Sequence, residues 1–171
     1  MVERLSLRRY PLTAMHEFQI EPHVGIDPVR LGASRSEARA ALSSIGFPLE
    51  NARGALDYFC EAAIQVEFDE QQRADFIGFS CHQAFTIFYR GVNVFDTPAQ
   101  DLFAVIAERD GSGAHSFRAA GYCFPSQIMT LWYADSQYDR LGGEQRVIWA
   151  QVGLGSSDYL DATRKIENCD A

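Results

Sequence analysis

The sequence predicts an α+β fold built from two tandem strand–helix–three-strand repeats, mostly antiparallel, with one helix per repeat. Apolar residues are 47% and charged residues 22% of the 171 residues, which is typical of a globular chain. Two helix-start patterns lie near Ser34 and Thr97, and three short aromatic and β-branched segments follow each of them. We therefore expect one compact domain (1–171) in which helix is the minority.

The first repeat (16–82) contains the clearer helix signal. Ser34 and Glu37 have the spacing of a capping box, in which each side chain binds the other residue's backbone amide. Apolar residues follow at helical spacing, and Gly46 is a typical helix stop. These features predict a helix over residues 35–45.

Three strands are predicted after this helix, separated from it by a loop with Pro48 and Gly54. They cover residues 57–60, 63–69 and 73–81. In the middle strand Ile64, Val66 and Phe68 alternate with polar residues, which indicates a half-buried antiparallel strand. The third strand has no polar face, so we place it at the centre of the sheet.

The second repeat (84–155) shows the same order of elements. An apolar extended segment precedes Thr97, which opens a second predicted capping box with Pro98 at the first helical position, and Gly111 ends that helix. Strands are predicted within 116–124, 127–134 and 145–154. A short terminal helix capped by Ser156 completes the chain (156–171). We expect the two repeats to share a continuous sheet or to pack sheet against sheet.

Residues 25–39 read Gly-Ile-Asp-Pro-Val-Arg-Leu-Gly-Ala-Ser-Arg-Ser-Glu-Ala-Arg. This stretch resembles the G-x-x-P-x-x-L-G-x-S-x-x-E helix opening of many small bacterial proteins of unassigned function. It is also similar to the helix start of the SmpA/BamE-like fold. The outer-membrane lipoproteins of that fold carry an export signal and a lipidated cysteine, which this sequence lacks. The resemblance therefore implies a local helix start and transfers neither a function nor a binding residue.

Charge and composition exclude several classes of protein. A net charge of −8 and a pI near 4.9 argue against nucleic-acid binding and against an anionic membrane surface. The sequence shows no export signal and no apolar run of 18 residues, and its four cysteines form no CxxC pair. We expect reduced thiols and a cytoplasmic location. Fourteen of the fifteen basic residues are arginine, which indicates a bacterial origin.

No catalytic motif is present, so we expect neither an enzyme nor a bound metal or cofactor. The four histidines, His16, His23, His82 and His115, show no metal-ligand spacing. Cys81 and His82 are neighbours, which on a strand point to opposite faces. One alternative is a small hydrolase or small-ligand-binding domain with its site between the two repeats, using dispersed acids and His115 or His82. Another is a structural or self-associating subunit.

The function that we expect is protein binding, and within that class an immunity protein that neutralises a cognate bacterial toxin. A nuclease toxin is basic where it meets phosphates, so an acidic protein could cap that site and associate rapidly. Residues 57–75 carry six acids and a single base. The predicted partner surface consists of Asp69, Glu70, Asp135, Tyr138 and Asp139, with the tyrosine as an anchor among the acids.

Overall fold

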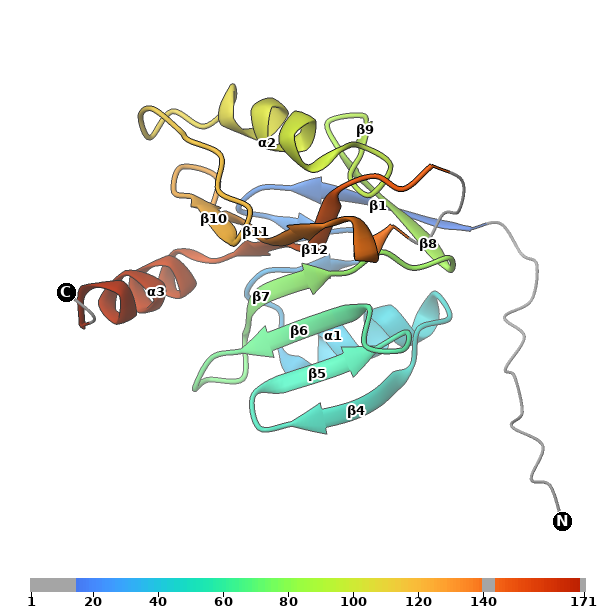
Figure 1. Ribbon diagram of the computed structural model, residues 1–171. Helices are drawn as coiled ribbons and strands as arrows, with labels where there is room; N and C mark the ends of the chain where they lie inside the picture. Colours follow the sequence, from blue (N-terminus) through green and yellow to red (C-terminus); the bar gives the residue numbers. More distant parts are fainter. Residues whose placement is uncertain (1–14, 140–143, 170–171) are drawn as a thin grey trace, which may run out of the picture.

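The computed structural model describes residues 15–139 and 144–169, which form two sheets and three helices around one core (Figure 1). A seven-stranded antiparallel sheet has the order β10-β11-β12-β7-β6-β5-β4, and a five-stranded sheet has the order β3-β2-β1-β8-β9. Strand exceeds helix, which confirms the predicted α+β class.

Both halves of the described chain place strands before one helix and antiparallel strands after it, but three strands precede and four follow α1, whereas two precede and three follow α2. The first half contains β1 (His16–Glu21), β2 (Gly25–Ile26), β3 (Val29–Arg30), α1 (Arg35–Ser44), β4 (Leu49–Arg53), β5 (Leu56–Phe59), β6 (Ile64–Phe68) and β7 (Ala74–Phe79). The second contains β8 (Phe85–Tyr89), β9 (Val92–Asn93), α2 (Ala99–Ala107), β10 (Gly121–Phe124), β11 (Met129–Asp135), the short 3-10 helix η1 (Ser136–Tyr138) and β12 (Ile148–Gly155). The helix α3 (Ser157–Cys169) follows, and Ser156 caps it by accepting a hydrogen bond from the Tyr159 amide.

The two halves join at a seam in the middle of the large sheet. There β7 and β12 pair antiparallel, with Phe79 opposite Val152 and Ile77 opposite Leu154. Strand β7 is the fourth of seven, and every side chain from Phe76 to Phe79 is buried, which confirms its predicted central position. The small sheet is shared as well, because β1 pairs with β8 in the one parallel ladder among the described strands.

One face of the seven-stranded sheet is covered and forms the core. The small sheet packs on this face, with the Phe18 and Phe79 rings 5.6 Å apart. The helices α1 and α2 flank the small sheet. Arg35 of α1 contacts Asp57 of β5, and Trp149 of β12 donates a hydrogen bond to the Ala99 carbonyl of α2 across 3.0 Å. Figure 1 shows α1 behind β5 and β6, with the opposite face of the sheet toward the viewer.

The local predictions hold for α1 and fail at two other places. The capping box of α1 is present, since the Ser34 hydroxyl accepts from the Glu37 amide and the Glu37 carboxylate accepts from the Ser34 amide. The predicted box of α2 is wrong. Pro98 is the N-cap, and the Thr97 hydroxyl donates instead to the Asn93 carbonyl, because the chain turns tightly after β9.

The predicted loop with Pro48 and Gly54 is also wrong, because it contains the strand β4. All five of its residues are exposed at the edge of the sheet, so no alternation of buried and polar residues marks it in the sequence. None of the helices in the described ranges combines the length and the apolar composition that crossing a membrane requires.

Candidate functional site

The structure separates the predicted acidic residues into two groups. Asp69 follows the end of β6, and Asp135 is the last residue of β11. Strands β6 and β11 run in opposite directions, because β7 and β12 lie between them and every neighbouring pair is antiparallel. The Asp69–Glu70 turn and the Asp135–Asp139 segment therefore lie at opposite ends of the sheet and form no single acidic patch.

Two of the acids counted in the sequence are not surface charges. The Asp139 side chain is only 3% exposed and pairs with Arg146, whose Nε lies 2.9 Å from its Oδ2. Asp57 is completely buried and is held by two arginines of α1. The prediction that Asp139 belongs to the partner surface is therefore wrong, and so is the count of Asp57 as a surface acid. Both side chains are buried in ion pairs.

The other predicted residues remain accessible. Glu70 is exposed, while the half-buried Asp69 accepts a hydrogen bond from the Arg73 amide in the β6–β7 turn. Asp135 accepts from the Gln137 amide and so caps η1. Tyr138 packs edge-on against Tyr133 with ring centroids 6.2 Å apart. These acids shape turns as well as contributing negative charge.

The seven-stranded sheet has a second face, opposite the core, which we call the open face. Tyr58, Gln65, Gly78, Gly153, Thr130 and Cys123 form a continuous row across it, each opposite the next in register. The helix α3 packs on this face, where Tyr159 stacks on Phe76 with centroids 4.7 Å apart. The Phe76 ring and the Gln151 side chain lie over Gly78 and Gly153, and the other four residues of the row are partly exposed.

Two aromatic residues on β11 stand out at the open face. Trp132 is 59% exposed and Tyr133 is 44% exposed, with ring centroids 5.7 Å apart. Neighbouring strand residues normally point to opposite faces, but Tyr133 has a φ of 49° in the left-handed region. This backbone bend at Tyr133 lets its ring lie in solvent beside the ring of Trp132.

A hollow of about 260 Å³ lies beside Trp132 at the seam between the two halves. We call it the seam hollow; its lining residues are Ser80, Cys81, Trp132, Tyr138, Ala150 and Gln151. The sequence analysis predicted Tyr138 as an anchor but gave no role to Trp132, which lies within the strand predicted at 127–134. Only the register of β11 against β12 shows that this side chain faces away from the core.

The structure gives two histidines acidic neighbours. His82 Nδ1 lies 3.3 Å from Cys60 Sγ, and His82 Nε2 lies 3.2 Å from Glu61 Oε2. Burial, together with the negative charges of Glu50 and Glu61, raises the pKa of the Cys60 thiol to about 12, so the nucleophilic thiolate is disfavoured.

His115 Nε2 lies 3.3 Å from Asp110 Oδ1, and its Nδ1 lies 2.9 Å from the Tyr122 hydroxyl. Both the His82 and the His115 side chains are only 6% exposed, and neither lines the seam hollow. In the described chain no group of three or more His, Cys, Asp or Glu residues has the geometry to hold a metal ion. Among the described residues Cys60, Cys81 and Cys123 form no disulfide.

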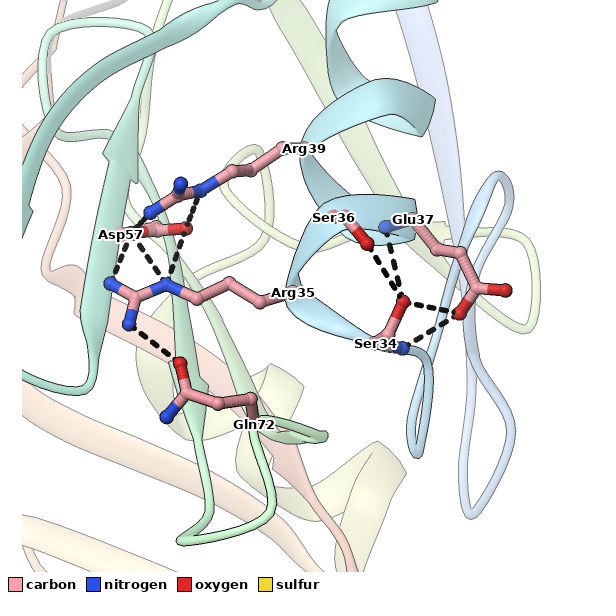
Figure 2. A network of polar contacts seen from close by, with 7 residues as sticks. All are labelled: Ser34, Arg35, Ser36, Glu37, Arg39, Asp57 and Gln72. Carbon is pink, nitrogen blue, oxygen red and sulfur yellow. Dashed lines mark hydrogen bonds and ion pairs between the residues drawn. The ribbon is translucent and has the colours of Figure 1, made fainter.

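A buried ion-pair cluster joins α1 to the large sheet (Figure 2). Asp57 on β5 accepts hydrogen bonds from Arg35 and from Arg39, with shortest N–O distances of 2.7 Å in both cases. Arg35 also donates to the Gln72 side chain across 3.0 Å and lies 5.1 Å above the Phe68 ring. The two arginines are one helical turn apart, and that spacing is the only sequence signal that could have indicated a shared acidic partner.

Comparisons of the chain with known protein families, with curated proteins and with solved structures found no match. The candidate site therefore depends on geometry alone.

Proposed function

We propose that this protein binds another protein through the open face of its seven-stranded sheet. The observation that carries the proposal is the pair of exposed rings, Trp132 and Tyr133, beside the seam hollow on the open face. Aromatic side chains are enriched at protein interfaces and often dominate binding energy when they enter a pocket of the partner. The side chains of Gln65, Thr130 and Gln151 on the same face can form hydrogen bonds with a partner around such anchors.

Within that class we propose an inhibitor that neutralises a cognate bacterial toxin. A net charge of −8 favours a basic partner and speeds the approach of one. The Asp69–Glu70 turn and Asp135 lie at opposite ends of the sheet, so they would contact the two rims of a partner that spans the face. Tyr138 and Trp132 would contact its centre.

The alternative of a small-ligand or hydrolytic site between the two halves has the position of the seam hollow in its favour. The hollow is lined by a hydroxyl, a thiol, an amide and two aromatic rings, and by neither a histidine nor a carboxylate. That lining suits the contact of a protein side chain better than general acid–base chemistry.

The test uses the gene next to the one that encodes this chain. Where that gene encodes a large secreted protein with a variable C-terminal domain, this domain is expressed in bacteria with and without the chain, and survival is measured. We expect the chain to restore survival and Trp132→Ala to abolish the rescue. Val147→Ala is the matched control, because Val147 is also exposed (48%) but precedes β12.

Two outcomes would contradict the proposal. A chain that gives no protection and shows no binding to the purified toxin domain would exclude toxin neutralisation by this pair. Equal loss of binding for Trp132→Ala and Val147→Ala would show that the open face is not the contact surface.

A further inference from the structure

The first turn of α1 and the β6–β7 turn border a second hollow, of about 580 Å³, which is wide open to solvent. We call it the arginine hollow; its lining residues are Ser34, Arg35, Ser36, Arg39, Gln71, Gln72 and Arg73. The hollow lies away from Trp132 and the seam hollow, although it shares the β6–β7 turn with the Asp69–Glu70 contact proposed above.

The lining of the arginine hollow is positively charged, whereas the chain as a whole is negatively charged. Three of its seven lining residues are arginines and none is acidic, although the chain as a whole carries a charge of −8. Asp57, below the hollow, neutralises only one of the two arginines that hold it. Three further acids lie near the hollow without lining it. Figure 2 shows the Glu37 carboxylate turned toward Ser34 and away from the arginine pair. Asp69 and Glu70 precede Gln71 in the β6–β7 turn, and Asp69 accepts a hydrogen bond from the Arg73 amide.

The guanidinium groups are fixed before any ligand arrives. Arg35 and Arg39 each make more than one hydrogen bond to the buried Asp57, so binding a ligand costs little side-chain entropy. The Nη1 of Arg39 donates to no described residue, and its side chain is 37% exposed. At the rim, Arg73 contributes one long hydrogen bond of 3.3 Å to the Gly32 carbonyl, which leaves its remaining donors available.

We propose that the arginine hollow binds the phosphoryl group of a small phosphorylated molecule. Guanidinium forks match the geometry of phosphate oxygens, and charge-assisted hydrogen bonds of this type are strong. The Ser36 hydroxyl and the amide groups of Gln71 and Gln72 add neutral donors, and the N-terminal end of α1 adds a positive dipole. The volume exceeds the needs of phosphate alone, so the remainder of the ligand would extend into the open part of the hollow.

The test is an NMR titration of the ¹⁵N-labelled full chain at constant ionic strength. The probes are inorganic phosphate, glycerol 3-phosphate and, as a singly charged carboxylate, acetate. We expect saturable shifts of the Ser36 and Gln72 amides and of the Arg39 Nε–H with both phosphates. Arg73→Gln should weaken phosphate binding by about tenfold, because one charged donor is lost. Arg118→Gln, at an exposed arginine that does not line the hollow, should leave the affinity unchanged.

Arg73 is chosen because it makes no ion pair with Asp57, so its replacement leaves the buried cluster intact. Tighter binding of glycerol 3-phosphate would support a phosphorylated metabolite as the source of the group, whereas equal binding would support free phosphate. Shifts that do not saturate would overturn the site. So would equal affinities of the Arg73→Gln and Arg118→Gln variants, or an acetate response as strong as that of phosphate.

Discussion

Asp57 is fully buried, yet its carboxylate is ionised and surrounded by arginine donors from a single helix. A charge in this position requires compensation, because an isolated buried carboxylate is very unfavourable. Arg35 and Arg39 supply that compensation and at the same time attach α1 to β5. The cost of desolvating the carboxylate is offset only while both partners stay in place.

Replacing Asp57 by alanine should therefore lower the free energy of unfolding by about 3–5 kcal/mol, the range found when one partner of a buried pair is removed. Equilibrium denaturation in urea measures the loss. Glu70→Ala is the control, because Glu70 is exposed in the β6–β7 turn and should change stability by less than about 0.5 kcal/mol. A similar small effect for both variants would show that the cluster contributes little.

The same residue makes stability depend on pH. Burial by itself would raise the pKa of Asp57, but the hydrogen bonds and charges of Arg39 and Arg35 outweigh it and hold the pKa below its usual value. The folded protein therefore binds this proton less readily than the unfolded chain does. The stabilisation is fully present above the unfolded pKa of about 3.9 and is lost as the pH falls below it.

Denaturation midpoints measured from pH 7 to pH 2 test this prediction. The difference in stability between the natural chain and Asp57→Asn should be constant above about pH 5 and should shrink as the pH falls below about 4. A difference that grows toward low pH would mean that the pKa of Asp57 is raised and not lowered.

At the scale of elements, local signals predict α1 and fail for β4. Ser34, Glu37 and Gly46 are sufficient to place α1, because a helix cap depends on residues close in sequence. The edge strand β4 depends on pairing with β5, and its exposed side chains give no pattern. The seam hollow could not be predicted from the sequence either, because its lining comes together only through the pairing of two strands that lie about 70 residues apart.

The glycines of β12 are an element-scale feature with a measurable role. A Cβ atom on Gly153 would lie 2.2 Å from the Phe76 ring, which itself is stacked on Tyr159 and cannot move away freely. The absence of a side chain lets the ring lie flat on the sheet. Gly153→Ala should therefore destabilise the protein by about 1–3 kcal/mol through overpacking.

The control for this substitution is Gly111→Ala, because a Cβ there meets no atom within 4 Å. Thermal unfolding followed by circular dichroism compares the two variants. We expect Gly111→Ala to be neutral or slightly stabilising. A Gly153→Ala protein as stable as the control would mean that Phe76 and α3 reposition without cost.

At the scale of the whole molecule, the two halves are joined twice, through β7 with β12 and through β1 with β8. The sequence allowed either a continuous sheet or two packed sheets, and the structure has both. This arrangement also determines the geometry of the candidate site. Because β7 and β12 pair antiparallel, the Asp69 turn and Asp135 lie at opposite ends of the large sheet. The same pairing brings residues of both halves together in the seam hollow.

Because both sheets cross the boundary between the halves, neither half should fold alone. A fragment of residues 15–83 would lose the partner strands of β7 and β1 and would expose Ile77 and Phe79, which are fully buried in the intact chain. A unit of about 70 residues buries too little surface to compensate for such a loss.

We expect fragments 15–83 and 84–169 to lack near-ultraviolet circular dichroism and a cooperative thermal transition when measured separately, and to regain both when mixed. The cut falls between β7 and β8 and interrupts no strand, so the intact chain is a fair reference. A cooperative transition in either isolated fragment would show that one half has a sufficient core of its own. In that case the seam would be an interface between two independent domains rather than the centre of one core.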